Sequence, residues 1–333
     1  MVPDTQAYRA RCSVVVSTRD RPRQLAACLH ALEKQRAPRF DVVVVDNAPA
    51  TLEARDVCQA RGVNYLVEPR PGMSRARNAG ARASSTEIVA FLDDDAVPEP
   101  DWLERLHEPF ADPRTGAVSG RILPFPPESA AEELLALHGG CDGGPQPRIV
   151  DRETPAWLEI ALFGGLGSGG NLAIRQRVFE ALGGFDERLG RGTPLHGGED
   201  NYALFSVVTR GHKVVYAPGA VVRHPSPRTR LDLRARQLKD LAAATGFFTF
   251  LLAEATGHRG AVLKYLAEGA VGKRRTWRIG TAVPPLRLVS RPRRVLALAQ
   301  GPLLYLRSQA LPRAAAPVAP LSTFSRRQAQ SES

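Results

Sequence analysis

The stretch Ile88-Val89-Ala90-Phe91-Leu92-Asp93-Asp94-Asp95 passes from five apolar residues directly into three carboxylates. An apolar run of this length, bounded by turn residues, is typical of a strand buried on both faces. In a parallel sheet, ligands bind beyond the carboxyl ends of the strands. Asp93 and Asp95 could therefore converge on one hard divalent cation, such as Mg²⁺ or Mn²⁺. The alternative is a solvated acidic turn or a helix N-cap, where aspartate is also common.

The first half of the chain alternates apolar runs with helical patterns. Strands are expected at 12–18, 42–45 and 63–67, before the one that ends at Asp93. Strands interleaved with helices predict an α/β fold with a Rossmann-like, mostly parallel central sheet flanked by helices. The helical patterns are a stripe of Leu25, Cys28, Leu29 and Leu32, and the segments 55–61 and 72–83.

Polar residues follow these strands at the edge where a ligand should lie. Ser17 and Thr18 offer hydroxyl and backbone NH groups, and Asp46 can accept from a nucleobase NH or a ribose hydroxyl. Arg75 and Arg77 can pair with phosphate or with a base edge. Each residue alone is as readily a helix cap, a turn residue or a solvated charge. Together, beside the three aspartates, they predict a pocket for a nucleotide diphosphate and a metal.

Composition is ordinary for a globular protein of 333 residues, with 43% hydrophobic and 24% charged residues. The four cysteines are scattered and form no CxxC pair, which favours reduced thiols over a disulfide framework or a zinc site. We recognise neither a signal peptide nor an apolar run long enough to span a bilayer. A cytoplasmic protein is therefore expected.

The net charge of +11 is unevenly distributed. From Arg223 onward there are 20 Lys/Arg against five Asp/Glu, whereas the remainder holds 25 basic and 29 acidic residues. Basic clusters at 273–275 and 291–294 flank apolar stretches. This pattern favours a peripheral position on the inner membrane face, bound to an anionic surface; a solvated face packed on the rest of the protein is the alternative. No nucleic-acid partner is expected.

Seven motifs occur in a fixed order over about residues 11–226. They are Val15-Val16-Ser17-Thr18-Arg19, Val44-Val45-Asp46-Asn47, Arg75-Ala76-Arg77-Asn78-Ala79-Gly80, Phe91-Leu92-Asp93-Asp94-Asp95, Gly169-Gly170-Asn171-Leu172-Ala173-Ile174-Arg175, Gly183-Gly184-Phe185-Asp186-Glu187 and Gly198-Glu199-Asp200. In this order the chain resembles the family 2 glycosyltransferases. The resemblance implies a GT-A fold, in which a nucleotide-binding parallel sheet joins an acceptor-binding half.

The resemblance also implies an activity and a role for individual residues. The enzyme would move a sugar from a UDP-, dTDP- or GDP-sugar to an acceptor hydroxyl, with inversion and with Mn²⁺ or Mg²⁺. Asp200 would be the catalytic base, and the metal would be held by Asp95, Asp93 and His224, although a lone histidine is also often structural. The donor would contact Ser17, Thr18, Arg19, Asp46, Arg77, Asp93 and Asp94. The acceptor side would include Trp157, Gly169, Gly170, Asn171 and Glu199.

This chemistry suits the residue types. An acceptor hydroxyl is a poor nucleophile, and the Asp200 carboxylate can take its proton as it attacks. A metal neutralises the charge that develops on the departing nucleotide diphosphate. Because base and leaving group lie on opposite faces of the sugar, one displacement inverts the anomeric carbon. Glu199 and Asp200 also fit the first turn of a helix, where the dipole favours acids, and both interpretations can hold together.

Three other functions match parts of the sequence. The segment Gly165–Gly170 contains a GxGxxG pattern, but it does not open the chain's first βαβ unit, so an oxidoreductase is disfavoured. A sugar-1-phosphate nucleotidyltransferase would need a glycine-rich loop after the first strand, and Ser17-Thr18-Arg19-Asp20 is not one. A catalytically silent sugar- or membrane-binding scaffold is the third alternative. The retained set of three aspartates and a histidine argues against it.

The expected organisation follows from where the motifs stop. An N-terminal arm at 1–10 precedes a catalytic domain at 11–227, with a nucleotide-sugar half at 11–120 and an acceptor half at 121–227. A basic helical extension at 228–311 and a disordered tail at 312–333 follow. The Gly- and Pro-rich segment 124–155 is expected to be a mobile or irregular loop. The acceptor stays open between a cell-surface glycan, a lipid-linked precursor and a small natural product.

Overall fold

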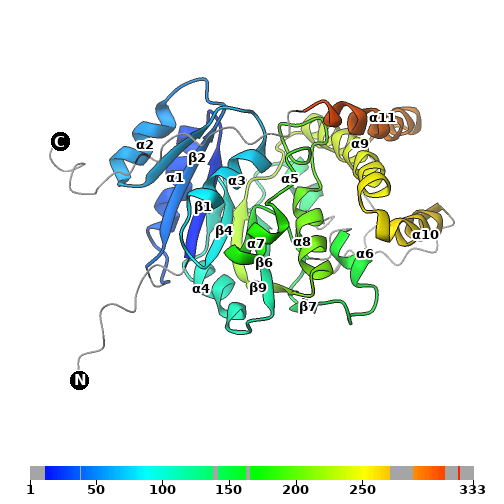
Figure 1. Cartoon of the computed structure of the whole chain (residues 1–333). Helices are drawn as coiled ribbons and strands as arrows, with labels where there is room; N and C mark the ends of the chain where they lie inside the picture. The colour runs from blue at the N-terminus through cyan, green and yellow to red at the C-terminus, as the bar shows by residue number, and fades with distance from the viewer. Residues whose placement is uncertain are drawn as a thin grey trace.

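The computed structural model describes residues 12–37, 39–137, 142–162, 166–270, 288–311 and 322. The expected N-terminal arm, the basic cluster at 273–275 and all of the expected tail except Ser322 lie outside these residues. Ser322 exchanges two backbone hydrogen bonds of 2.9 Å with Tyr65, at the edge strand of the sheet. Figure 1 shows one central sheet with helices on both faces and a further group of helices beyond one end of it.

The sheet has nine strands in the order β3-β2-β1-β4-β8-β6-β9-β5, with β7 paired to β9. The predicted strands are confirmed to within two residues at each end. Residues 213–224 form one long strand that ends at His224. The strands are β1 Cys12–Thr18, β2 Asp41–Asn47, β3 Asn64–Glu68, β4 Ile88–Asp93, β5 Val97–Pro98, β6 Thr115–Pro124, β7 Arg148–Val150, β8 Asn171–Arg175 and β9 Lys213–His224.

The expected parallel order holds for the first half of the sheet. Strands β3, β2, β1 and β4 are all parallel to one another, and the pairing of Ser17 with Asp93 brings the polar strand ends to one edge. The second half is mixed, because β8 runs antiparallel to both β4 and β6, and β6 is parallel to β9. The predicted fold class is confirmed, and its parallel character belongs to the nucleotide half.

Helices cover both faces because successive side chains of a strand point to opposite sides. Val14 and Val16 pack against the helices of one face, whereas Val15 packs against those of the other. The first face carries α1 Pro22–Leu32, α2 Glu53–Arg61 and α4 Trp102–His107. The second carries α3 Met73–Ala83, α6 Trp157–Leu162, α7 Gln176–Leu182 and α8 Glu199–Thr209. Short 3₁₀ helices occupy Glu108–Ala111 and Thr256–His258.

The segment 124–155 is more ordered than its composition suggests. It contains α5 Ala130–Leu137 and the strand β7, which pairs antiparallel with β9. Tyr216 of β9 donates its hydroxyl to the carbonyl of Gly144, 2.9 Å away. The expectation of an irregular loop is therefore wrong for these parts, since pairing to a long neighbouring strand supplies order that local composition does not reveal.

The C-terminal region is helical, as expected. It comprises α9 Arg230–Glu254, α10 Arg259–Ala270 and α11 Arg291–Gln309, which lie together in Figure 1. Phe247, Phe250 and Leu251 of α9 belong to the same buried cluster as Phe185 and Leu195. The helices thus share a core with the sheet domain. In the described part of the chain, we find no helix of the length and apolar character needed to cross a membrane.

Candidate active site

Two carboxylates and one imidazole meet where β4 and β9 end. The short strand β5 follows the acidic turn and pairs with the last residues of β9, which carries His224 back to Asp93 and Asp95. His224 Nε2 lies 3.1 Å from Asp95 Oδ1 and 3.9 Å from Asp93 Oδ2. One potential ligand atom from each of the three residues lies within 4.8 Å of the others. The arrangement is suited to a small cation.

Mutual pairing perturbs these groups. Burial disfavours the charged form of His224, but the hydrogen bond and charge of Asp95 outweigh it and raise the pKa of His224 above its usual value. Burial likewise disfavours the Asp95 carboxylate, yet His224 and Arg21 outweigh it and lower the pKa of Asp95. The cluster therefore favours an ionised carboxylate at its centre.

Asp94 contacts residues at the end of β1 and just after it. Thr18 Oγ1 donates to Asp94 Oδ2 at 2.8 Å, and Arg21 Nη1 lies 3.3 Å from the other oxygen. The same guanidinium reaches Asp95 Oδ2 at 2.9 Å. Burial raises the pKa of Asp94 to about 6, against the opposing effects of Thr18 and Arg21. Sequence reasoning selected Arg19 and missed Arg21; the signal was Pro22, which begins α1 and fixes Arg21 as its N-cap.

A cavity of about 210 Å³ opens beside this turn. Its walls come from β1, β2, α3 and a loop that precedes α8. Arg191 and Gly192 of that loop were not anticipated, because they lie between motifs and only the fold brings them to the cavity. The lining residues are Ser17, Thr18, Arg19, Arg21, Asn47, Met73, Ala76, Asp94, Arg191 and Gly192.

Two buried acceptor atoms near this edge lack a partner within the described chain. They are Ser17 Oγ and Asp46 Oδ1. The other Asp46 oxygen accepts from the Tyr65 hydroxyl at 2.9 Å. Burial raises the pKa of Asp46 to about 6, partly offset by that hydrogen bond. Because buried polar atoms are almost always satisfied, these two atoms are suited to a polar ligand.

Arg77 is buried and faces carboxylates, not the cavity. Its guanidinium donates to Asp93 Oδ1 at 3.0 Å and to Glu199 Oε1 at 3.1 Å. Arg77 does not line the cavity, and its expected position near the base or the phosphates stays a prediction. Gly169 and Gly170 pass so close that an added Cβ would lie 2.5 Å from Arg77 Nη1 and Asp93 Oδ2 respectively. These glycines belong to the site because no larger residue fits there.

Asp200 lies in the first turn of α8, next to Glu199. The backbone NH of Gly169 donates to Asp200 Oδ2 at 2.9 Å, and the NH of Asn201 donates to the other oxygen at 2.8 Å. Burial, reinforced by the charge of Asp200, raises the pKa of Glu199 to about 7, while Arg77 opposes the shift. Through Glu199 and Arg77, the start of α8 is tied to the end of β4.

Two residues expected on the acceptor side are engaged elsewhere. Asn171 is fully buried; its amide donates to the carbonyls of Arg121 and Ala220 and accepts from the Trp102 indole at 2.8 Å. Trp157 stacks on Phe205 of α8 at 5.9 Å. All polar side-chain atoms of Asn171 bind protein partners, and Trp157 packs in the helical layer. Their places on the acceptor side stay predictions.

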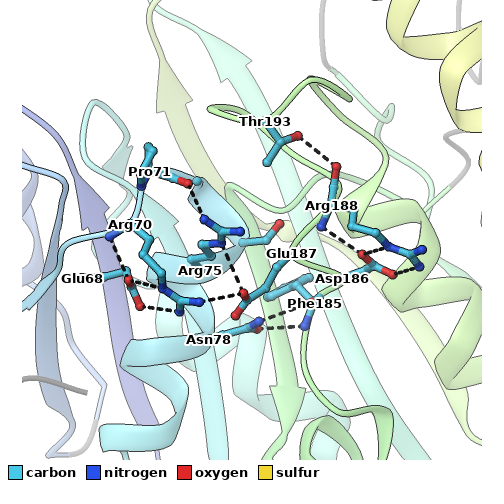
Figure 2. A network of polar contacts seen from close by, with 12 residues as sticks. Glu68, Arg70, Pro71, Arg75, Asn78, Phe185, Asp186, Glu187, Arg188 and Thr193 are labelled. Carbon is cyan, nitrogen blue, oxygen red and sulfur yellow. Dashed lines mark hydrogen bonds and ion pairs between the residues drawn. The ribbon is translucent and has the colours of Figure 1, made fainter. Parts of the chain in front are cut away.

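A second group of charged residues supports the loop that carries Arg191. Figure 2 shows Glu187 between Arg75 and Arg70, at 3.2 and 3.5 Å, with Glu68 paired to Arg70 at 3.0 Å. Arg75, one of the two arginines expected to pair with phosphate or with a base edge, thus pairs with a carboxylate of its own protein. In the same view Asn78 exchanges two hydrogen bonds with the backbone of Phe185.

Arg188 extends this support to the C-terminal helices. Its guanidinium pairs with Asp186 at 2.7 Å and with Glu254 of α9 at 2.7 Å, and it donates to Gln309 of α11 at 3.2 Å. Thr193 donates its hydroxyl to the Arg188 carbonyl. The loop beside the cavity is therefore anchored to both the sheet domain and the helices.

Comparison with known proteins gives relatives along much of the chain. A pre-mycofactocin glycosyltransferase of Mycobacterium tuberculosis (strain CDC 1551 / Oshkosh) is 29% identical over 240 residues, covering 71% of this chain and 45% of the relative. An O-antigen chain rhamnosyltransferase, WbaN of Salmonella anatum, is 30% identical over 201 residues, 59% of each chain. This chain thus spans about half the length of the first of these relatives.

A solved structure agrees with the fold. The mannosyltransferase PcManGT of Pyrobaculum calidifontis, in complex with GDP-mannose and Mn²⁺, superposes with a TM-score of 0.54 at 18% identity. The match covers 91% of this chain and 87% of that one, so the GT-A fold expected from the motifs is confirmed. A family model described as glycosyl transferase family 2 matches residues 13–183, about half of the chain. The chain therefore belongs to glycosyl transferase family 2.

Proposed function

We propose that this protein is an inverting, metal-dependent glycosyltransferase that moves a sugar from a nucleotide-diphosphate sugar to an acceptor hydroxyl. One observation carries the proposal: the Asp93, Asp95 and His224 cluster adjoins a cavity near which Ser17 Oγ and Asp46 Oδ1 are buried without partners. Carboxylates that could hold a cation thus lie near two unpaired acceptor atoms that could bind a nucleoside. The activities named for the relatives are of the same class.

The donor would lie with its nucleoside against the ends of β1 and β2. Asp46 Oδ1 and Ser17 Oγ would accept from the base or the ribose, with Thr18 beside them. Arg21 and Arg191, which line the cavity, would face the diphosphate, because guanidinium groups pair well with phosphate oxygens. UDP, dTDP and GDP sugars all present such groups.

The metal would be held by Asp95, Asp93 and His224. Two carboxylates and an imidazole are acceptable ligands for Mn²⁺ and, less fully, for Mg²⁺, which prefers oxygen. A bound ion would neutralise charge on the departing nucleotide diphosphate. Arg77 would keep Asp93 oriented, since it donates to Asp93 Oδ1 at 3.0 Å, while Asp93 Oδ2 is the oxygen nearer His224.

Asp200 would be the general base. It is half-buried, and the Gly169 and Asn201 backbone NH groups hold it in one orientation. Removing the proton of an attacking hydroxyl by a positioned carboxylate is worth about 10²–10⁴-fold in rate. Gly169 and Gly170 would form the wall beside the acceptor, together with Glu199.

The acceptor would be a glycan, a lipid-linked precursor or a small molecule. The basic C-terminal third suits attachment to an anionic membrane surface, so we propose a peripheral position on the inner face of the membrane. The runner-up function, a sugar-1-phosphate nucleotidyltransferase, gains no specific support from the site. A catalytically silent scaffold would retain the fold without turnover.

The first experiment is thermal stabilisation of the full chain by UDP, GDP and dTDP, each with and without Mn²⁺. We expect one diphosphate to raise the melting temperature only when the metal is present. Asp95→Asn should lose the metal-dependent shift, whereas the matched control Asp112→Asn, which removes a carboxylate paired with Lys213 at the opposite end of the strands, should keep it. No shift with any diphosphate would contradict the proposal and favour the scaffold.

A further inference from the structure

Helix α11 exposes an unusual amount of apolar surface. Of the ten large hydrophobic side chains exposed in the described residues, five lie on this one helix. Val295, Leu296 and Leu306 are each more than 60% exposed, and Leu298 and Leu303 are also exposed. At about 100° per residue, these five side chains fall on one side of the helix, the outer face of α11. Contiguous apolar surface of this kind usually marks an interaction site.

The opposite face of α11 is already occupied. Ala297, Gly301 and Ser308 are buried against α9, and an added Cβ on Gly301 would lie 2.4 Å from the backbone nitrogen of Gly246. The two helices, which lie side by side in Figure 1, therefore bring their backbones into close contact at this pair of glycines. Since packing within the protein uses the small residues, it leaves the large ones facing outward.

Positive charge borders the outer face of α11. The helix contains four arginines and no acidic residue. Arg293 and Arg307 flank one side of the apolar stripe, Arg294 flanks the other, and Arg291 lies at the N-terminal end of the stripe. A groove of about 220 Å³ lined by both Arg234 of α9 and Arg293 extends the basic border onto the neighbouring helix. An apolar stripe with cationic edges is the pattern of helices that lie in a membrane interface.

We propose that the outer face of α11 docks on an anionic lipid bilayer, with Leu296, Leu303 and Leu306 among the acyl chains and the arginines at the headgroups. Long basic side chains can reach headgroup phosphates while their stems cover apolar surface. The rest of the chain, up to His224, carries more acid than base, so an anionic surface would attract this end and repel the other. The inference rests on the proposed peripheral position and not on the transfer reaction.

A second copy of this chain is the competing occupant. A twofold dimer through the outer face of α11 would bring the arginines of both copies together, because the same patch meets itself in such an interface. No acidic residue on α11 would offset that repulsion. Charge therefore favours an anionic bilayer over self-association.

The test is flotation of the full chain with vesicles of phosphatidylcholine, alone or mixed equally with phosphatidylglycerol. The wild type should bind the mixed vesicles and not the neutral ones, and added salt should weaken binding. Leu303→Asp with Leu306→Asp should reduce binding at least about tenfold, since buried apolar area drives insertion. Arg293→Gln with Arg294→Gln should weaken it as well. Ile149→Asp, the same change at an exposed residue of β7, should leave it unchanged.

Thermal melting of each variant and sedimentation velocity complete the design. If the double aspartate variant melts abnormally, Leu303→Gln with Leu306→Gln replaces it. The proposal is overturned if the wild type ignores anionic vesicles, or if the folded leucine variants bind as the wild type does. A wild-type dimer that the leucine variants dissociate, without vesicle binding, would also overturn it. Because no donor or acceptor is present, failure of the proposed enzymatic function would not affect the result.

Discussion

Two groups of charged residues near the cavity differ in how their carboxylates are paired. In the arginine network of Glu68, Arg70, Arg75 and Glu187, two carboxylates meet two guanidinium groups (Figure 2). In the acidic site, the four carboxylates of Asp93, Asp94, Asp95 and Glu199 share two guanidinium groups, those of Arg21 and Arg77, and one imidazole, that of His224. The matched network stabilises a loop, whereas the acidic site, with more carboxylates than guanidinium groups, is suited to the cation that we propose.

The largest effect is expected where the carboxylate would do chemistry. Asp200→Asn should lower kcat by about 10²–10⁴-fold, because the amide cannot accept the acceptor's proton. Donor affinity, measured by thermal shift with the nucleotide diphosphate and Mn²⁺, should stay within about twofold. Glu187→Gln, in the arginine network, should leave kcat nearly unchanged. Loss of donor binding in Asp200→Asn would contradict the assignment of Asp200 as a base.

The second-largest effect is expected at Arg77 of the acidic site, whose counterpart in the arginine network is Arg75. Arg77→Met should lower the free energy of unfolding by about 3–5 kcal/mol, because it leaves Asp93 and Glu199 buried without their shared cation. Arg75→Met should cost less, since Glu187 keeps Arg70. Urea denaturation of both variants measures the difference. Equal losses in the free energy of unfolding would show that the two guanidinium groups are structurally equivalent, which would contradict the difference between the two groups of charged residues.

A third effect is pH-dependent and lies at Asp46. Burial raises its pKa from 3.8 to about 6, so the folded state holds this proton more tightly than the unfolded one. Its stabilisation is present below the unfolded pKa and is lost as pH rises through about 6. Asp46→Asn should therefore gain about 2–3 kcal/mol relative to wild type between pH 4 and pH 7, measured by urea denaturation. A pH-independent difference would contradict the shift.

The variant should nevertheless bind the nucleotide diphosphate more weakly at neutral pH. A carboxylate oxygen without a protein partner is replaced by an amide, which cannot accept at both of its atoms. Measuring both the stability and the nucleotide binding of Asp46→Asn shows whether Asp46 destabilises the folded protein but contributes to binding, or affects stability alone.

The smallest effect is expected at the link between the loop and the helices. Arg188→Met removes contacts to Asp186, Glu254 and Gln309, and should cost about 1–2 kcal/mol in urea denaturation. The donor KM should rise modestly, since Arg191 of the same loop lines the cavity. An unchanged KM with the expected loss of stability would limit Arg188 to a structural role.

The strands and their polar ends could be predicted because their signals are local. A buried parallel strand is a short apolar run, and its end is marked by the first polar residues, as at Asp46 and Asp93. The pairing of Arg77 with Glu199, which is 122 residues away, has no such signal. The contacts of Asn171 have no local signal either: it follows a glycine-rich stretch, yet its partners come from three distant segments.

The shared core of the sheet domain and α9 has a consequence for how the protein unfolds. Phe247, Phe250 and Leu251 pack in one buried cluster with Phe185 and Leu195. A chain ending near residue 227 would expose to water the apolar surface that α9 covers beside the Arg191 loop, and we expect it to aggregate. The motif-bearing segment and α9 should instead melt in one cooperative transition. Point substitutions on the outer face of α11 can therefore probe membrane docking in the intact chain, which a truncation at that boundary cannot.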